Sequence, residues 1–170
     1  MAEAFPKPTL RPYLPADLAV LRAIFAASIA ELAGEDYDEE QRAAWIAAAG
    51  DVDAFAARLA NALTIVAERG GEVAGFASLS DGALDLLYVH PGAAGQGVGT
   101  TLIDAIEKLA AARGVEKLAA DVSDNAEAFF LRRGYVAQRR QSLVRFDVTL
   151  ANTMMTKVLP NAAKAGARPI

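Results

Sequence analysis

Three short apolar segments, separated by two glycine turns, place the strongest constraint on the fold of this chain. The segments run from Leu63 to Glu68, from Val73 to Leu79 and from Leu84 to Val89. Gly70-Gly71 and Asp81-Gly82 separate them, and dipeptides of this kind form tight hairpin turns. The pattern predicts an antiparallel meander of three strands.

A glycine-rich segment follows the meander and leads into an amphipathic helix. Apolar residues recur there at helical spacing: Val98, Leu102, Ile103, Ile106, Leu109 and Ala110. Gly114 ends this pattern, and Val115 to Val122 is typical of a buried strand. A crossover helix between a meander and a further strand predicts an α/β fold of the α+β type, with a mixed, mostly antiparallel sheet flanked by helices.

The segment before the meander predicts a short strand, Thr9 to Arg11, and then helices. The first helix starts at Pro15 and should bury a stripe of apolar residues: Leu18, Leu21, Phe25, Ile29 and Leu32. Asp38 and Gln41 have the spacing of a capping box before a second helix. Further elements are a helix over 51–59, a helix over 125–133 and an antiparallel strand pair over 135–144 and 148–158. We expect one domain over 1–159 and a mobile tail over 160–170.

Composition excludes several kinds of chemistry. The 170 residues include no cysteine, so disulfides, thiolate nucleophiles and thiolate metal ligands are excluded. His90 is the one histidine, and we expect no metal site. A formal net charge of −4 argues against a nucleic-acid partner. No apolar run reaches the roughly 18 residues of a membrane span, and no leader pattern begins the chain, so we expect a cytoplasmic protein without a membrane partner.

The glycine-rich segment Ala94-Gly95-Gln96-Gly97-Val98-Gly99-Thr100 has the properties of an anion site. Glycines allow close approach of a ligand to the backbone, and a helix start directs N–H groups and a positive dipole end at it. A plain turn before a helix is the alternative interpretation. A Walker loop is excluded because no Gly-Lys-Ser/Thr follows, and the G-x-G-x-G spacing after a meander disfavours a nicotinamide or flavin enzyme.

Two segments in order resemble the motifs of the GNAT superfamily of acyl-CoA-dependent N-acyltransferases. The strand Leu86 to Pro91 with Gly95 to Gly99 looks like motif A, usually Q/R-x-x-G-x-G/A. The second motif, typically N-x-x-A-x-x-F-Y-x-x-x-G-F with variable spacing, is matched by Asn125, Ala128, Phe129, Phe130, Gly134 and Tyr135. The resemblance covers roughly residues 9–158. A narrower likeness to a poorly characterised bacterial subgroup supplies no substrate.

The resemblance implies acetyl-CoA as donor and a GNAT-like fold. The pantetheine arm would pair, like an added strand, with the backbone of Leu87, Tyr88 and Val89. Asn125 would contact the pantetheine or thiol region, and Phe130 would lie beside the coenzyme. The pyrophosphate would lie on the amides of one continuous run: Gly95, Gln96, Gly97, Val98, Gly99 and Thr100.

Two positions differ from the family pattern and favour an alternative function. Ala94 replaces the Gln or Arg that heads motif A, and Phe130 replaces a tyrosine that often protonates the leaving thiolate. A phenyl ring donates no proton. The alternative is therefore a GNAT-fold module that binds acyl-CoA or a protein without catalysis.

The leading hypothesis is an N-acetyltransferase in which a primary amine attacks the thioester directly in a ternary complex, because no cysteine can carry the acyl group. Asp85 is the candidate base: strand alternation places it on the face of Leu87 and Val89, among apolar groups. A solvated carboxylate after a turn is the alternative. Tyr88 is the candidate acid, with Tyr135, Ser123 or water as alternatives. For His90 a structural turn role is preferred to a catalytic one.

The acceptor pocket should be bordered by Glu35, Tyr37 and Trp45, which belong to the first helices and their connection. A solvated surface is the alternative for Glu35 and Tyr37, whereas Trp45 is expected to belong half to the core and half to the pocket wall. The acceptor is expected to be a small-molecule amine or an amino terminus. Two interpretations are open for the apolar residues of the final strand pair, a homodimer interface or core packing: Val148, Leu150, Met154 and Met155.

Overall fold

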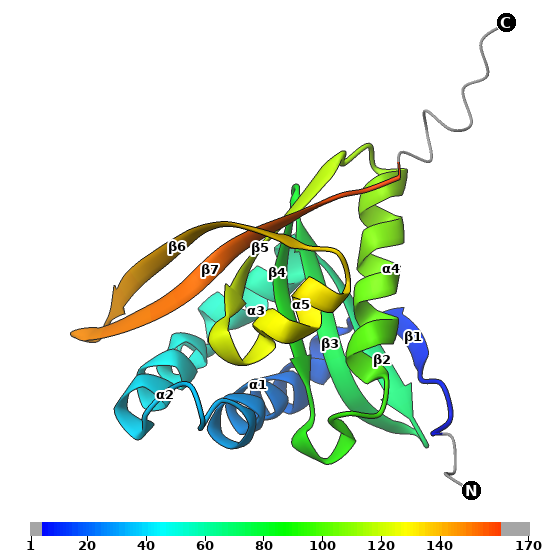
Figure 1. The fold of residues 1–170 in the computed structure, drawn as a ribbon. Helices are drawn as coiled ribbons and strands as arrows, with labels where there is room; N and C mark the ends of the chain where they lie inside the picture. The colour runs from blue at the N-terminus through cyan, green and yellow to red at the C-terminus, as the bar shows by residue number, and fades with distance from the viewer. Residues whose placement is uncertain (1–4, 161–170) are drawn as a thin grey trace, which may run out of the picture.

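Seven strands form one sheet in the order β1-β2-β3-β4-β5-β7-β6. The structure is a computed structural model that describes residues 5–160 (Figure 1). Neighbouring strands are antiparallel except for β4 and β5, which are parallel, so the predicted mixed, mostly antiparallel sheet is confirmed. The strands are β1 (Thr9–Pro12), β2 (Leu63–Arg69), β3 (Glu72–Ser80), β4 (Ala83–Val89), β5 (Lys117–Ser123), β6 (Val136–Arg145) and β7 (Val148–Val158).

Helices cover both faces of the sheet and divide the core into two main clusters. One face carries α4 (Val98–Ala112) and α5 (Glu127–Arg132), and the other carries α1 (Leu18–Leu32), α2 (Glu39–Ile46) and α3 (Val52–Asn61). The stripe predicted for α4 is buried apart from Leu109, which is half-buried. Because apolar burial is the main favourable term in folding, this helix is held firmly against the sheet.

The first helices follow the sequence pattern with one exception. The Asp38 carboxylate accepts a hydrogen bond from the Gln41 amide at 2.8 Å, and the Gln41 side chain returns one to the Asp38 amide at 2.9 Å, so the capping box is confirmed. Leu32 was expected in the buried stripe, and this is wrong: it is 38% exposed. It is the last residue of α1, and the next residue, Ala33, is buried in its place.

Strands β4 and β5 are paired only where both begin. Their register is limited to Ala83 with Ala119 and Leu84 with Ala120. Beyond these pairs the two strands diverge, as Figure 1 shows, while β5 continues to pair with β7 over its whole length. A gap therefore opens in the middle of the sheet toward the carboxyl ends of β4 and β5.

The β6–β7 hairpin forms a long arm that reaches α2 (Figure 1). Gln41 on α2 donates from its side chain to the Thr149 carbonyl at 3.2 Å. Leu150 and Met155 of β7 are buried in the core, so core packing accounts for these two residues. The homodimer stays a prediction, which light scattering can test.

Two expectations concern the ends of the chain and the membrane. Most of the predicted tail, residues 161–170, lies outside the described residues, while Leu159 is buried and donates its amide to the Glu116 carbonyl at 2.9 Å. Within residues 5–160, no helix has the length and apolarity to cross a bilayer.

Candidate active site

The edge of β4 that faces the gap is formed by alternate backbone groups. The His90 amide donates to the Ala74 carbonyl of β3 at 2.8 Å. Because backbone groups of successive strand residues point to opposite sides, Tyr88 also faces β3, while Leu87 and Val89 face the gap. The N–H and C=O groups of Leu87 and Val89 are thus directed to a space where β5 no longer pairs. An extended ligand can pair with them as an added strand does.

The glycine loop lies at the start of α4, where the gap ends. Gly95 and Gly97 have φ values of 74° and 86°, a left-handed conformation that favours glycine. The first bond into the helix runs from the Thr101 amide to the Gly97 carbonyl at 3.0 Å. The preceding helical amides have no acceptor within the helix and can bind an anion. All six residues of the predicted amide run, 95–100, lie in this turn or in the first turn of α4.

Side chains beside the loop shape it further. Gln96 donates to the Gly92 carbonyl at 3.3 Å and accepts a hydrogen bond from Arg69 of β2. A Cβ on Gly99 would lie 3.7 Å from the Phe129 ring, so α5 packs closely against the start of α4. His90 accepts a hydrogen bond from the Gly92 amide through Nδ1 at 2.9 Å, as the turn interpretation of His90 predicts.

A cleft occupies the gap between β4 and β5. Leu87 and Tyr88 line one side of it, and Asn125 and Phe130 line the other. Asn125 is exposed, whereas Phe130 is buried and packs edge-on against Tyr135 with ring centroids 5.0 Å apart. The structure therefore brings together these four residues of the predicted coenzyme set in one cleft.

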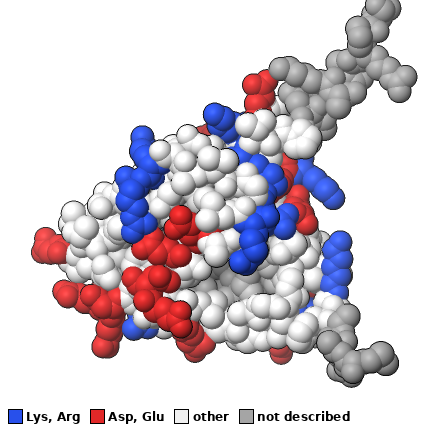
Figure 2. Space-filling model, in the orientation of Figure 1, with Lys and Arg blue, Asp and Glu red and all other residues white. Residues whose placement is uncertain are grey.

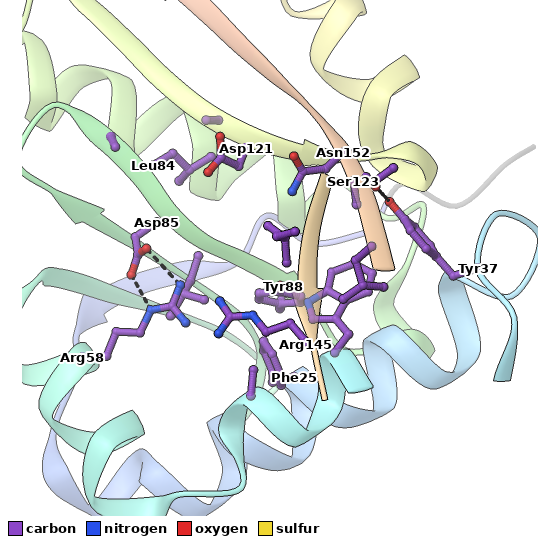
Figure 3. A pocket seen from close by; sticks show the side chains of 18 of the residues that line it. Phe25, Tyr37, Arg58, Leu84, Asp85, Tyr88, Asp121, Ser123, Arg145 and Asn152 are labelled. Carbon is purple, nitrogen blue, oxygen red and sulfur yellow. Dashed lines mark hydrogen bonds and ion pairs between the residues drawn. The ribbon is translucent and has the colours of Figure 1, made fainter. Parts of the chain in front are cut away.

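A larger cavity of about 260 Å³ lies on the α1–α2 side of the sheet (Figure 3). It shares lining residues with the cleft, so the two spaces meet at the gap: Trp45, Leu84, Asp85, Leu86, Tyr88, Ala120, Asp121 and Ser123. Sites that hold drug-sized ligands measure roughly 300–1,000 Å³. The cavity is therefore suited to a small second reactant beside the cleft.

Asp85 does not have the surroundings that strand alternation predicted. The register of β3 and β4 shifts so that Ser78 pairs with Leu86 and Leu79 pairs with Leu84, which leaves Asp85 as the extra residue of a β-bulge. Its carboxylate accepts two hydrogen bonds from Arg58 of α3, at 2.7 and 3.0 Å. The expectation that Asp85 shares an apolar face with Leu87 and Val89 is thus wrong. It lines the cavity instead, as an ion pair (Figure 3).

Tyr88 lies within a cluster of aromatic rings on the same side. Its ring centroid is 4.7 Å from that of Phe25, 5.8 Å from that of Phe76 and 6.4 Å from that of Trp45. Burial raises the pKa of Tyr88 to about 12, and the Trp45 side chain and then the Arg58 guanidinium act in the opposite direction. The phenol is therefore protonated at neutral pH, as a proton donor must be.

The three predicted acceptor residues occupy different positions. Tyr37 and Trp45 line the cavity, with ring centroids 5.4 Å apart, whereas Glu35 is exposed and lines neither space. The Tyr37 hydroxyl donates to the Ala151 carbonyl at 2.6 Å and accepts from the Asp124 amide at 3.0 Å. Both bonds are structural, so Tyr37 can offer a bound molecule its ring but has its hydroxyl engaged.

Three charged residues of the cavity were not identified from the sequence: Arg58, Asp121 and Arg145. Asp121 offered a partial signal, because it interrupts the apolar run of β5 as an exposed residue between buried neighbours. Arg58 and Arg145 offered none, since a charged residue on a helix or hairpin is usually a solvated one. No group of three or more acidic or histidine side chains arranged to hold a metal ion occurs among residues 5–160.

Comparison with known proteins decides the family. The family model described as "Acetyltransferase (GNAT) domain" matches residues 33–159. The chain belongs to the GNAT acetyltransferase family. It is 30% identical over 132 residues to the uncharacterized N-acetyltransferase YafP of Escherichia coli strain K12, an alignment that covers 78% of this chain and 83% of YafP.

Solved structures agree with this assignment. A GCN5-related N-acetyltransferase from Rhodopseudomonas palustris has 53% sequence identity and a TM-score of 0.90, over 94% of this chain and all (100%) of that one. The PaiA N-acetyltransferase of Thermoplasma acidophilum, solved in complex with coenzyme A, has 18% identity and a TM-score of 0.74, over 90% of this chain and 99% of that one. At this lower identity the likeness shows the GNAT fold alone.

Proposed function

We propose that this GNAT-family chain transfers the acetyl group of acetyl-CoA to a primary amine by direct attack in a ternary complex. The observation that carries the proposal is the open β4 edge at Leu87 and Val89, which leads to the amides at the start of α4. A pantetheine arm requires such an edge, and a pyrophosphate requires such a helix start. This route needs no lysine or arginine, so an acidic protein can provide it.

The acetyl group would meet the amine where the cleft joins the cavity. The amine nitrogen attacks the thioester carbonyl, the C–N bond forms, and the C–S bond breaks. The nitrogen then loses a second proton, which replaces the proton given to the departing thiolate. An alkylamine has a pKa of about 10, so a proton must leave it before attack. Asp85 is the proposed acceptor of that proton, directly or through water, and Arg58 holds its carboxylate in place.

The departing thiolate would be stabilised or protonated from the same side. Tyr88 lines both the cleft and the cavity, and its raised pKa keeps the phenol protonated. Tyr88 is therefore the proposed acid in place of the missing tyrosine at Phe130. A thiolate with a pKa of about 8.5 is a fair leaving group, so this contribution is smaller than that of the base.

The test is a panel of amines incubated with acetyl-CoA, with thiol release measured by absorbance and the acetylated amine identified by mass spectrometry. The proposal predicts stoichiometric thiol and N-acetyl product. The alternative, a GNAT-fold module without catalysis, is favoured by Ala94 and Phe130. It predicts acetyl-CoA binding with no product from any amine, and this result would overturn the proposed reaction.

A further inference from the structure

The cavity contains four charged side chains, and two of them neutralise each other. Arg58 and Asp85 form a bidentate ion pair. Asp121 and Arg145 do not form ion pairs within residues 5–160: Asp121 accepts only from the neutral Gln141 amide, at 2.7 Å. The cavity therefore offers the carboxylate of Asp121 and the guanidinium of Arg145 to a bound molecule. These two groups are complementary to a molecule that carries both an ammonium and an anionic group.

The two groups occupy different depths relative to the coenzyme cleft. Asp121, on β5, lines both the cleft and the cavity, so it lies near the place where the acetyl group would be presented. Arg145, the last residue of β6, lines the cavity alone. Figure 3 shows both side chains at the cavity, together with those of Tyr88 and Phe25. An acceptor would therefore place its amine at the Asp121 end and its anion at the Arg145 end.

Part of the cavity wall is aromatic. Phe25, Trp45 and Tyr88 line the cavity, and their rings contact one another at centroid distances of 4.7 and 6.4 Å. Such a wall favours an apolar body between the two charged ends. The volume of about 260 Å³ limits that body to the size of a small metabolite.

We infer that the acceptor is a small amino acid-like amine, with its ammonium on Asp121, its carboxylate on Arg145 and an apolar side chain against the aromatic wall. This inference rests on the proposed acetyl transfer and specifies its substrate class. Asp121 holds the ammonium near Asp85, which then takes the proton that must leave before attack. Arg145 suits a carboxylate because a guanidinium can donate two parallel hydrogen bonds to it.

A second surface feature favours a different class of acceptor. Acidic side chains gather over α2 and the adjoining end of α1 (Figure 2), and all of them are exposed: Glu31, Glu35, Asp36, Asp38, Glu39 and Glu40. Such a surface attracts cationic molecules such as polyamines. Its field is screened by salt over about 10 Å, whereas charges within the cavity contact the acceptor directly, and these therefore decide selectivity.

The experiment compares amines that differ only in the carboxylate. Wild-type protein is given acetyl-CoA with L-phenylalanine or phenethylamine, and with L-leucine or 3-methylbutylamine, and kcat/KM is measured for each. We expect the carboxylated member of at least one pair to be preferred by about tenfold or more. Arg145→Gln should lower that ratio to below about two. Arg113→Gln, which changes an exposed arginine at the far end of α4, should keep the wild-type ratio.

Each other result overturns a different claim. Equal or better acetylation of the decarboxylated amines, or of spermidine in the same assay, would overturn the amino acid inference and leave the acetyl transfer intact. A carboxylate preference that Arg145→Gln does not change would also overturn it. If no amine is acetylated although acetyl-CoA binds, the proposed function fails, and the inference fails with it.

Discussion

The guanidinium of Arg58 and the carboxylate of Asp85 form two hydrogen bonds, with Nε 2.7 Å from Oδ2 and the second nitrogen 3.0 Å from Oδ1. The pair joins α3 to the β-bulge in β4, at the wall of the cavity of about 260 Å³. An arginine bound in this way fixes the orientation of a carboxylate. The ion pair thus fixes the orientation of the carboxylate that we propose as the proton acceptor.

Asp85→Asn should lower kcat/KM by about 100-fold or more, because a general base contributes roughly 10²–10⁴-fold. Arg58→Gln should cost less, since it removes only the positioning of the carboxylate. Steady-state kinetics across neutral pH, with circular dichroism to confirm folding, makes the comparison. If folded Asp85→Asn protein keeps the wild-type kcat/KM at every pH, Asp85 has no part in the reaction.

Tyr88→Phe should lower kcat by about tenfold to a hundredfold while leaving acetyl-CoA affinity nearly unchanged, because only the hydroxyl is lost. Since burial raises the pKa of Tyr88 to about 12, the phenol stays protonated through the pH range of an assay. Wild-type kcat should therefore show no alkaline loss due to Tyr88 below about pH 11. An alkaline limb near pH 10 that disappears in Tyr88→Phe would contradict this assignment.

The same pKa predicts how stability changes at high pH. A tyrosine whose pKa is raised in the folded state stabilises the fold fully below its unfolded pKa of about 10, and that stabilisation is lost as pH rises toward about 12. Urea unfolding at several alkaline pH values should show a steeper loss for the wild type than for Tyr88→Phe. If the free energy of unfolding falls equally with pH in the wild type and in Tyr88→Phe, Tyr88 is not the group responsible for the loss.

Tyr37→Phe should reduce the free energy of unfolding by about 1–3 kcal/mol, because it leaves the Ala151 carbonyl and the Asp124 amide without their buried partner. Tyr13→Phe is the matched control: no side-chain hydrogen bond of Tyr13 occurs among the described residues, so a change within about 0.5 kcal/mol is expected. Urea denaturation measures both. If both substitutions change the free energy of unfolding by the same small amount, the two hydrogen bonds of Tyr37 contribute little to stability.

Gly97→Ala and Gly114→Ala form a matched pair at the two ends of α4. Their φ values are 86° and 84°, and a Cβ at either position would meet nothing within 4 Å. Each substitution should therefore cost about 1–2 kcal/mol of backbone strain. Only Gly97→Ala should weaken acetyl-CoA binding, because only that end of α4 would present amides to the pyrophosphate. Similar affinities for the two variants, measured by calorimetry, would place the coenzyme elsewhere.

Local patterns predicted most of the fold. The turns at Gly70-Gly71 and Asp81-Gly82, the capping box of Asp38 and the stripe of α4 depend on residues close together in the chain. Leu32 was misjudged because helical periodicity does not show where the covering core ends. The β-bulge at Asp85 was missed for a similar reason: it depends on how β3 and β4 pair, and strict alternation assumes no extra residue.

The proposed acceptor cavity was predicted less completely than the proposed coenzyme site. The residues proposed to bind the coenzyme lie in two continuous motifs, whereas Arg58, Asp121 and Arg145 reach the cavity from three separate elements. Tyr37 contacts Asp124 and Ala151, which are 87 and 114 residues away in the sequence. Such contacts follow from tertiary packing, and no local spacing encodes them.

Calorimetric titration of the purified protein with acetyl-CoA, desulfo-coenzyme A and NADH tests the proposed donor site most directly. We predict saturable 1:1 binding of both coenzyme A compounds and no heat from NADH beyond dilution, because the open β4 edge suits a pantetheine arm and the amides of α4 suit a pyrophosphate. No binding of either coenzyme A compound would contradict this prediction, since Ala94 and Phe130 would then mark a donor site that no longer functions.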